Sequence, residues 1–116
     1  MTKYKKLIDV LSSYYDLEVK IKNLKLDIEE AEIFDNRELS LSLQNKLKLA
    51  QEQWFNINNA LKNLTPVGME VFEMKFKYRK THLDIVERFN VSRSSAYLFI
   101  EKNLYKKLNH VLVASE

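Results

Sequence analysis

The scarcity of turn-forming residues is the strongest constraint on what this chain can fold into. Its 116 residues include one glycine, Gly68, and one proline, Pro66. The tight turns that join neighbouring strands need glycine or a comparable residue, so a sheet would have almost nothing to close its hairpins. Leucine, lysine, glutamate, asparagine and isoleucine dominate instead, a composition that favours helices. We therefore predict an all-α protein.

Apolar residues in the first half repeat at steps of three and four, the spacing of one helix face. Residues 2–34 show such a seam with one three-residue slip after Tyr14, and a second seam continues to residue 64. The break between them includes Asp35 and Asn36, either of which is a candidate N-cap for the second helix. Two long helices joined by a short polar loop predict an antiparallel, coiled-coil-like hairpin over residues 1–63.

A hairpin standing alone would leave part of its seams exposed to water. We therefore expect this region to form a dimer or higher homo-oligomer, or to dock another protein. The oligomerisation contacts are predicted on the cleaner second seam, at Leu43, Leu47, Trp54, Ile57 and Leu61.

Residues 64–116 are predicted to form a second domain around a helix-turn-helix. Thr65 is a candidate N-cap and Pro66 suits the first position of a helix. At residues 81–101 the apolar spacing breaks once, at Asn90 and the two residues after it, between two short helical patterns. Asn90 tolerates the left-handed conformation that ends a helix, and Ser92 is a suitable N-cap for the next one.

Positive charge is concentrated on this second domain. Residues 75–107 contain 9 basic and 3 acidic side chains, which is typical of a surface that faces phosphates. In a helix-turn-helix the start of the second helix reaches base edges, which predicts base-reading roles for Arg93, Ser94, Tyr97 and Leu98. The predicted phosphate contacts on double-stranded DNA are Arg79, Lys80, Ser92, Ser95, Lys102 and Lys106. The alternatives are a solvated lysine-rich face and an Arg93 that only pairs with a neighbouring carboxylate.

The motif LTPVGMEVFEMKF at residues 64–76, followed by residues 81–110, resembles the fourth, promoter-binding region of housekeeping bacterial sigma factors. Joined to a helical arm, this layout is similar to RinA/ArpU-type phage activators. The resemblance implies a DNA-binding activator of late genes that works beside host RNA polymerase in the bacterial cytoplasm. Sigma factors have charged and amide residues where this chain has Ser94, Ser95, Tyr97 and Leu98, so their promoter element is not expected to be the target.

Two other functions fit the same pattern. One is a protein-interaction module that binds RNA polymerase or another regulator without reading DNA, and the other is a small terminase-like packaging subunit. An enzyme is not expected, because His82 and His110 are the only histidines and no catalytic constellation or glycine-rich phosphate loop accompanies them. We predict no catalytic residue, no metal and no cofactor. The absence of cysteine and of any long apolar run favours a reducing cytoplasm and no membrane segment.

Overall fold

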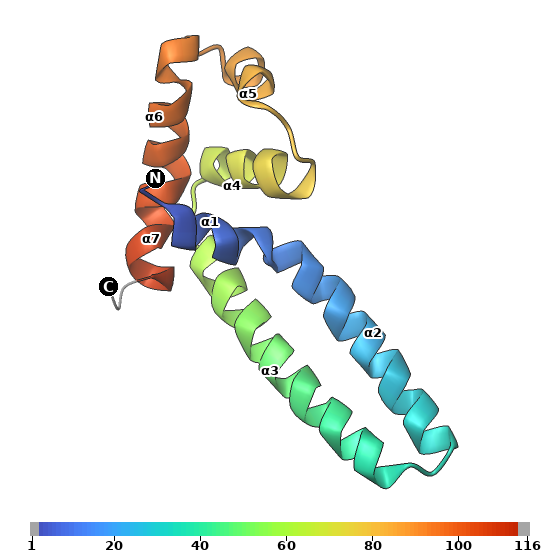
Figure 1. Ribbon diagram of the computed structural model, residues 1–116. Coiled ribbons are helices and arrows are strands. Elements are labelled where there is room, and N and C mark those ends of the chain that lie inside the picture. Colours follow the sequence, from blue (N-terminus) through green and yellow to red (C-terminus); the bar gives the residue numbers. More distant parts are fainter. Residues whose placement is uncertain (1–2, 114–116) are drawn as a thin grey trace.

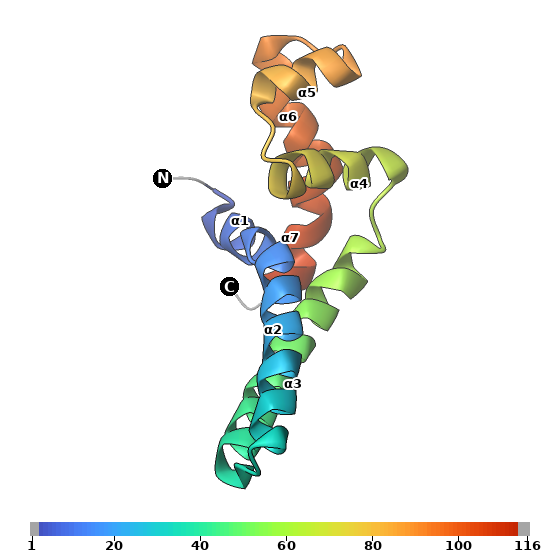
Figure 2. The same cartoon turned by 90° about the vertical axis from the view of Figure 1, so that its right-hand side faces the viewer.

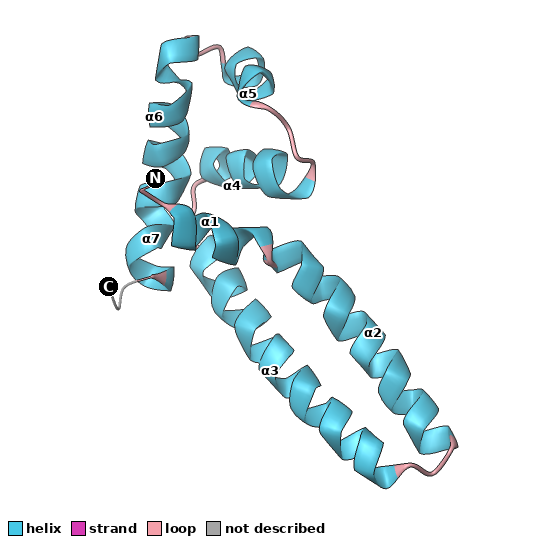
Figure 3. Ribbon diagram, viewed as in Figure 1, coloured by secondary structure: helices cyan, strands magenta, loops and turns pink. Residues whose placement is uncertain are grey.

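The structure is a computed structural model that describes residues 3–113, and within that range every regular element is a helix (Figure 3). The all-α prediction is confirmed. The first half contains α1 (Lys5–Ser12), α2 (Tyr14–Ile33) and α3 (Arg37–Leu61). The second half begins with α4 (Pro66–Phe72), which continues into a π-helical turn (Glu73–Lys77), and α5 (His82–Phe89) follows.

The last part of the chain is one continuous helix with local changes of winding. A 3-10 turn (Arg93–Ser95) leads into α6 (Ala96–Ile100), a π-helical turn (Glu101–Tyr105) and α7 (Lys106–Leu112). We call residues 93–112 the C-terminal helix. It runs from the end of the molecule occupied by α5 down to the junction with α1 and α3 (Figure 1).

Helices α2 and α3 form the antiparallel hairpin that the two seams predict, and it extends away from the rest of the molecule (Figures 1 and 2). We call residues 14–61 the arm. Asn36 is the N-cap of α3, since its side-chain oxygen accepts a hydrogen bond from the Leu39 amide at 3.1 Å. Asp35, the other candidate, adopts the left-handed conformation with φ 54°. The molecule is 59 Å along its longest axis, mainly because of this arm.

The helix expected over residues 2–34 is divided at Ser13. The Ser13 hydroxyl donates to the Val10 carbonyl at 2.6 Å, an arrangement that competes with regular helical bonding. As a result α1 turns away from the axis of the arm and packs against α7. Leu7 and Leu11 of α1 are fully buried there. The slip in the heptad seam thus lies close to a change of packing partner.

Helix α1 and residues 66–112 share one hydrophobic core, and we call them together the head. The largest fully buried side chains of the described chain all belong to it: Phe72, Leu7, Leu11, Ile85, Ile100, Leu104, Leu108 and Val71. The predicted division at residue 63 follows the end of α3. In space, however, α1 belongs with the C-terminal helices, because its apolar face is buried among them.

Helix α4 crosses the C-terminal helix at its π-helical turn. Thr65 caps α4 by accepting a hydrogen bond from the Gly68 amide at 3.1 Å, and Pro66 occupies the first helical position, as predicted. At Gly68 the two backbones approach so closely that an added Cβ would lie 2.5 Å from the Asn103 carbonyl oxygen. The crossing therefore requires the chain's single glycine.

Candidate nucleic-acid interface

Helix α5 and the C-terminal helix form a helix-turn-helix at the end of the molecule farthest from the tip of the arm (Figure 1). Thr81 and Asp84 form the capping box that starts α5. Asn90 ends α5 in the left-handed conformation, with φ 55° and ψ 45°, as predicted. The two helices are held together by a tilted ring contact between Phe89 and Phe99, whose centroids lie 5.0 Å apart.

Three serine side chains form a hydrogen-bonded group at the N-terminus of the C-terminal helix. Ser92 is its N-cap and accepts a hydrogen bond from the Ser95 amide at 3.2 Å. The Ser92 hydroxyl also bonds to the hydroxyls of Ser95, at 2.8 Å, and Ser94, at 3.2 Å. Ser92 and Ser95 are thus occupied in capping, so a phosphate contact by either hydroxyl would have to share these bonds.

The predicted base-reading residues all lie on the exposed surface of this first part of the C-terminal helix. Leu98 is 62% exposed and Tyr97 is 40% exposed, while Arg93 and Ser94 also face solvent. Within residues 3–113 the Arg93 guanidinium makes no ion pair with any carboxylate, so the alternative role as an intrachain partner does not apply. Arg93 also borders a shallow groove between the two helices, beside His82 and Leu83.

Most of the basic side chains near this surface are free to face a polyanion. Arg79, Lys80, Lys102 and Lys106 are exposed, and Arg79 holds the left-handed conformation with φ 53° in the loop before α5. Arg88 is not free, because its guanidinium binds the Glu70 carboxylate through two nitrogens, one of them at 3.0 Å. That pair joins α5 to α4 and belongs to the scaffold.

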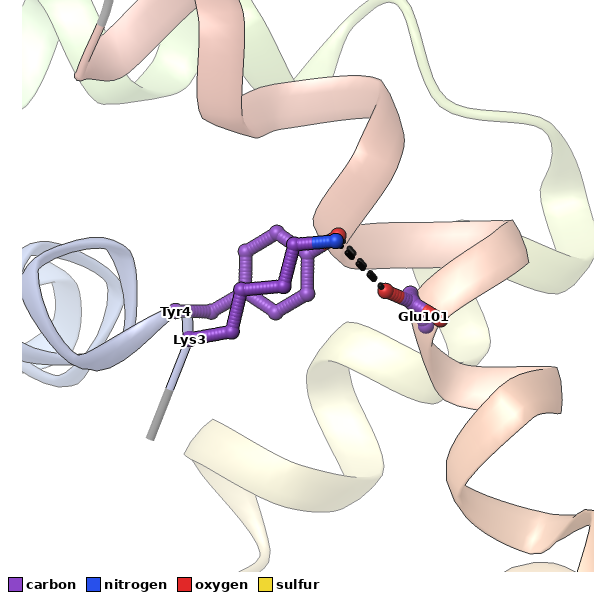
Figure 4. Close-up of polar contacts among 3 residues, drawn as sticks. All are labelled: Lys3, Tyr4 and Glu101. Atoms are coloured by element: carbon purple, nitrogen blue, oxygen red, sulfur yellow. Dashed lines mark hydrogen bonds and ion pairs between the residues drawn. The ribbon is translucent and has the colours of Figure 1, made fainter. Parts of the chain in front are cut away.

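Glu101 follows the predicted base-reading residues on the C-terminal helix, and its carboxylate contacts Lys3 and Tyr4. The Tyr4 hydroxyl donates to its carboxylate at 2.7 Å, and the Lys3 ammonium lies 3.7 Å away (Figure 4). The bond to Tyr4, together with Lys106 and Lys3, holds the pKa of the Glu101 carboxyl below its ordinary value. Burial and Glu101 raise the pKa of Tyr4 to about 12.

This contact places the start of the chain beside the middle of the C-terminal helix. The ring of Tyr4 also packs on Tyr105, with centroids 5.2 Å apart. The exposed surface that contains the predicted base-reading residues therefore ends near Lys102, and the Glu101 carboxylate is paired with Tyr4 and Lys3. Sequence spacing offers no signal for a contact that joins residues 97 positions apart.

The groove beside Arg93 borders a side-chain pair that the sequence did not predict. Lys75 Nζ lies 3.5 Å from His82 Nε2, at the start of α5. Burial lowers the pKa of Lys75, and burial together with the charge of Lys75 lowers the pKa of His82. Both shifts favour the neutral form of His82, whose unprotonated Nε2 can accept a hydrogen bond from the Lys75 ammonium.

The five predicted oligomerisation residues hold the arm together within one chain. Ile57 and Leu61 are buried, and Leu43, Leu47 and Trp54 are half-buried in the contact with the rest of the core. Trp54 stacks on Tyr14 with ring centroids 5.7 Å apart. The seam is thus an intrachain contact in this structure, because a heptad pattern does not specify whether the partner helix belongs to the same chain.

Comparisons with protein-family models, with curated proteins and with solved structures found no match. The resemblance to sigma factors and phage activators therefore rests on the motif and layout alone. No helix of the described residues has the length and apolar character needed to cross a membrane. Across residues 3–113 no cluster of three or more histidine or carboxylate side chains is arranged to hold a metal ion.

Proposed function

We propose that this protein is a DNA-binding transcriptional regulator of the phage-activator type, acting beside RNA polymerase. The observation that supports this most directly is the unpaired, exposed Arg93 on the first turn of the second helix of a helix-turn-helix. In such motifs the start of that helix enters the major groove. A free arginine there can donate two hydrogen bonds to guanine, the commonest specific base contact.

The surrounding residues support separate roles in positioning and reading. Positive charge for phosphates comes from Arg79 and Lys80 in the loop before α5 and from Lys102 and Lys106 further along the C-terminal helix. Ser94 and Tyr97 offer hydroxyls for polar contacts, and the Leu98 side chain suits a thymine methyl group. The activator role and the polymerase partner come from the resemblance to RinA/ArpU-type proteins.

The test is a binding titration on fragments selected from the source genome and on random DNA at several salt concentrations. Arg93→Ala is expected to weaken specific binding by about 1 to 3 kcal/mol and to leave random binding nearly unchanged. Lys102→Ala is expected to weaken both equally and to reduce the slope of log affinity against log salt by about one. Equal losses on both DNAs for Arg93→Ala would remove its base-reading role.

Arg37→Ala is the matched control, since Arg37 is an exposed arginine at the far end of the arm. It removes the same charge without touching the helix-turn-helix, so both affinities should stay at wild-type values. No binding to any DNA at low salt would eliminate the proposed function.

Exposed Leu98 favours a second candidate, a protein-interaction module whose helix-turn-helix contacts RNA polymerase without reading DNA. A large aliphatic side chain that is 62% exposed beside an exposed tyrosine is typical of a protein contact. Leu98→Ser would then abolish co-purification with bacterial RNA polymerase, while Arg93→Ala would not. If Leu98→Ser retains polymerase and only loses DNA affinity, the first proposal stands and the second fails.

A further inference from the structure

Helix α2 has an aliphatic stripe on the side that faces away from α3. Val19, Leu26 and Ile33 are 60%, 55% and 78% exposed and are spaced seven residues apart. A buried residue of the arm's seam lies two positions before each of them. These buried residues are Leu17, Leu24 and Ala31. Two positions correspond to about 200° around a helix, so the stripe lies opposite the seam. The fold of a single chain leaves this stripe uncovered.

Charged residues flank the stripe in a definite order. Lys22 lies between Val19 and Leu26, and Glu29 lies between Leu26 and Ile33 on the same flank. Both charged side chains are exposed, and within residues 3–113 neither makes an ion pair. Glu30 lies on the other flank, about 100° around the helix from Glu29. The stripe therefore has a basic and an acidic half along one edge.

We propose that this face of α2 is the contact surface for a second copy of the chain, packed antiparallel about a twofold axis at Leu26. In that arrangement Leu26 meets its symmetry mate, and Val19 lies opposite Ile33 of the second copy. Residues on the same flank become neighbours in an antiparallel pair, so Lys22 lies beside Glu29 of the second copy at two symmetric positions.

The charges select this direction over the parallel one. Parallel packing would bring opposite flanks together and place Glu29 beside Glu30 of the second copy, again twice. Like charges at that spacing repel, whereas the antiparallel pairs attract. The contact contains only three aliphatic side chains per chain, so the dimer should be weak and dependent on concentration. It requires no DNA and does not rest on the proposed function.

Cysteine cross-linking tests the geometry directly, because the chain has no cysteine of its own. Under mild oxidation Leu26→Cys should cross-link to itself. Val19→Cys alone should not, whereas a mixture of Val19→Cys and Ile33→Cys should form the mixed dimer, since only opposed positions come within disulfide distance. Self-cross-linking of Val19→Cys would show parallel packing, and no cross-link at Leu26→Cys would show that the contact does not form.

Charge reversal tests the pairing in solution by sedimentation equilibrium. Lys22→Glu and Glu29→Lys should each raise the dimer dissociation constant by roughly two- to thirty-fold, because each disturbs two symmetric pairs. The double variant should return close to the wild-type value. If Glu29→Lys instead strengthens the dimer, the parallel arrangement is correct and the proposal is overturned. Lys48→Glu, an exposed change on α3, should have no effect.

Leu26→Glu should leave the protein monomeric at every concentration, with an unchanged circular dichroism spectrum as proof of folding. Leu41→Glu is the matched control, since Leu41 is 61% exposed on α3 and lies outside the stripe. This control should dimerise like the wild type. A wild-type chain that stays monomeric throughout, or an oligomer that survives Leu26→Glu, would overturn the proposal.

Discussion

The head and the arm are both helical, but they are stabilised in different ways. The head has a fully buried core, to which α1, α4, α5 and the C-terminal helix each contribute at least one large side chain. The arm is a two-helix layer, whose seam residues Leu43, Leu47 and Trp54 stay half-exposed. Two helices cannot enclose a core, so the arm keeps apolar surface in water. The head therefore has a core shielded from water, whereas the arm has apolar surface that another protein surface could cover.

The largest expected effect comes from truncating a fully buried leucine in the head. Leu104→Ala should lower the free energy of unfolding by about 2 to 5 kcal/mol, because it leaves a cavity in a closed core. Leu47→Ala, the matched change in the arm, should cost only about 1 kcal/mol, because water already reaches that side chain. Urea unfolding followed by circular dichroism measures both values. Equal losses would show that the arm is packed as tightly as the head.

Gly68→Ala should be the next most damaging change. The added methyl group would press on the Asn103 carbonyl, a backbone atom that cannot rotate away, and should cost about 1 to 3 kcal/mol. Asn45→Ala, at an exposed position of the arm, should be neutral or slightly stabilising. Thermal unfolding of the two variants compares them. Replacing an unhindered glycine in a helix by alanine stabilises a protein by about 1 kcal/mol. A gain of this size for Gly68→Ala would contradict the close contact between α4 and the C-terminal helix.

Loss of a cap in the head should have a smaller effect. Thr81→Ala removes both hydrogen bonds that the hydroxyl makes in the capping box of α5, at a cost of about 0.5 to 2 kcal/mol. Thr81→Ser keeps the hydroxyl and should retain most of that stability. Hydrogen exchange of the α5 amides would report local opening in the first variant only. Unchanged protection would mean that packing alone holds this helix.

The smallest effect at neutral pH is expected for Tyr4→Phe, which removes the hydrogen bond to Glu101 and should cost about 0.5 to 1.5 kcal/mol. The difference in stability between the wild type and Tyr4→Phe depends on pH. Burial raises the pKa of Tyr4, Tyr15 and Tyr105 to about 12 from an ordinary value of 10.0.

The unfolded chain therefore loses these phenolic protons first as the pH rises. The stability linked to them is complete below pH 10.0 and is lost as the pH approaches about 12. Thermal unfolding across this window should show a shallower decline for Tyr4→Phe than for the wild type. Identical slopes would show that Tyr4 is as accessible to solvent as a free tyrosine.

Local signals in the sequence predicted the local structure of the chain. Thr65 and Ser92 cap the helices as predicted, and Asn90 ends α5 in the left-handed conformation. Each of these features depends on groups within a few residues of one another, so the sequence contains all the information needed. The predicted roles of Arg93, Lys102 and their neighbours stay predictions, because they concern a partner outside the chain.

The contacts between distant segments could not be predicted in the same way. Nothing local shows that Tyr4 bonds to Glu101, that Gly68 meets Asn103, or that α1 packs against α7. An amphipathic pattern predicts that one face of a helix is buried, but it does not identify the helix that packs against that face. For the same reason the second seam predicts an oligomer contact, whereas in this structure α2 of the same chain packs against it.

The sequence by itself determined the all-helical class, the helix boundaries near caps, the hairpin and the basic helix-turn-helix. Those properties follow from turn chemistry, periodicity and charge, which act over short stretches. Only the tertiary structure decided that α1 joins the head, that the α3 seam is an intrachain contact, and that the uncovered aliphatic stripe lies on α2. These outcomes depend on which apolar faces meet, and that choice is made by the whole chain.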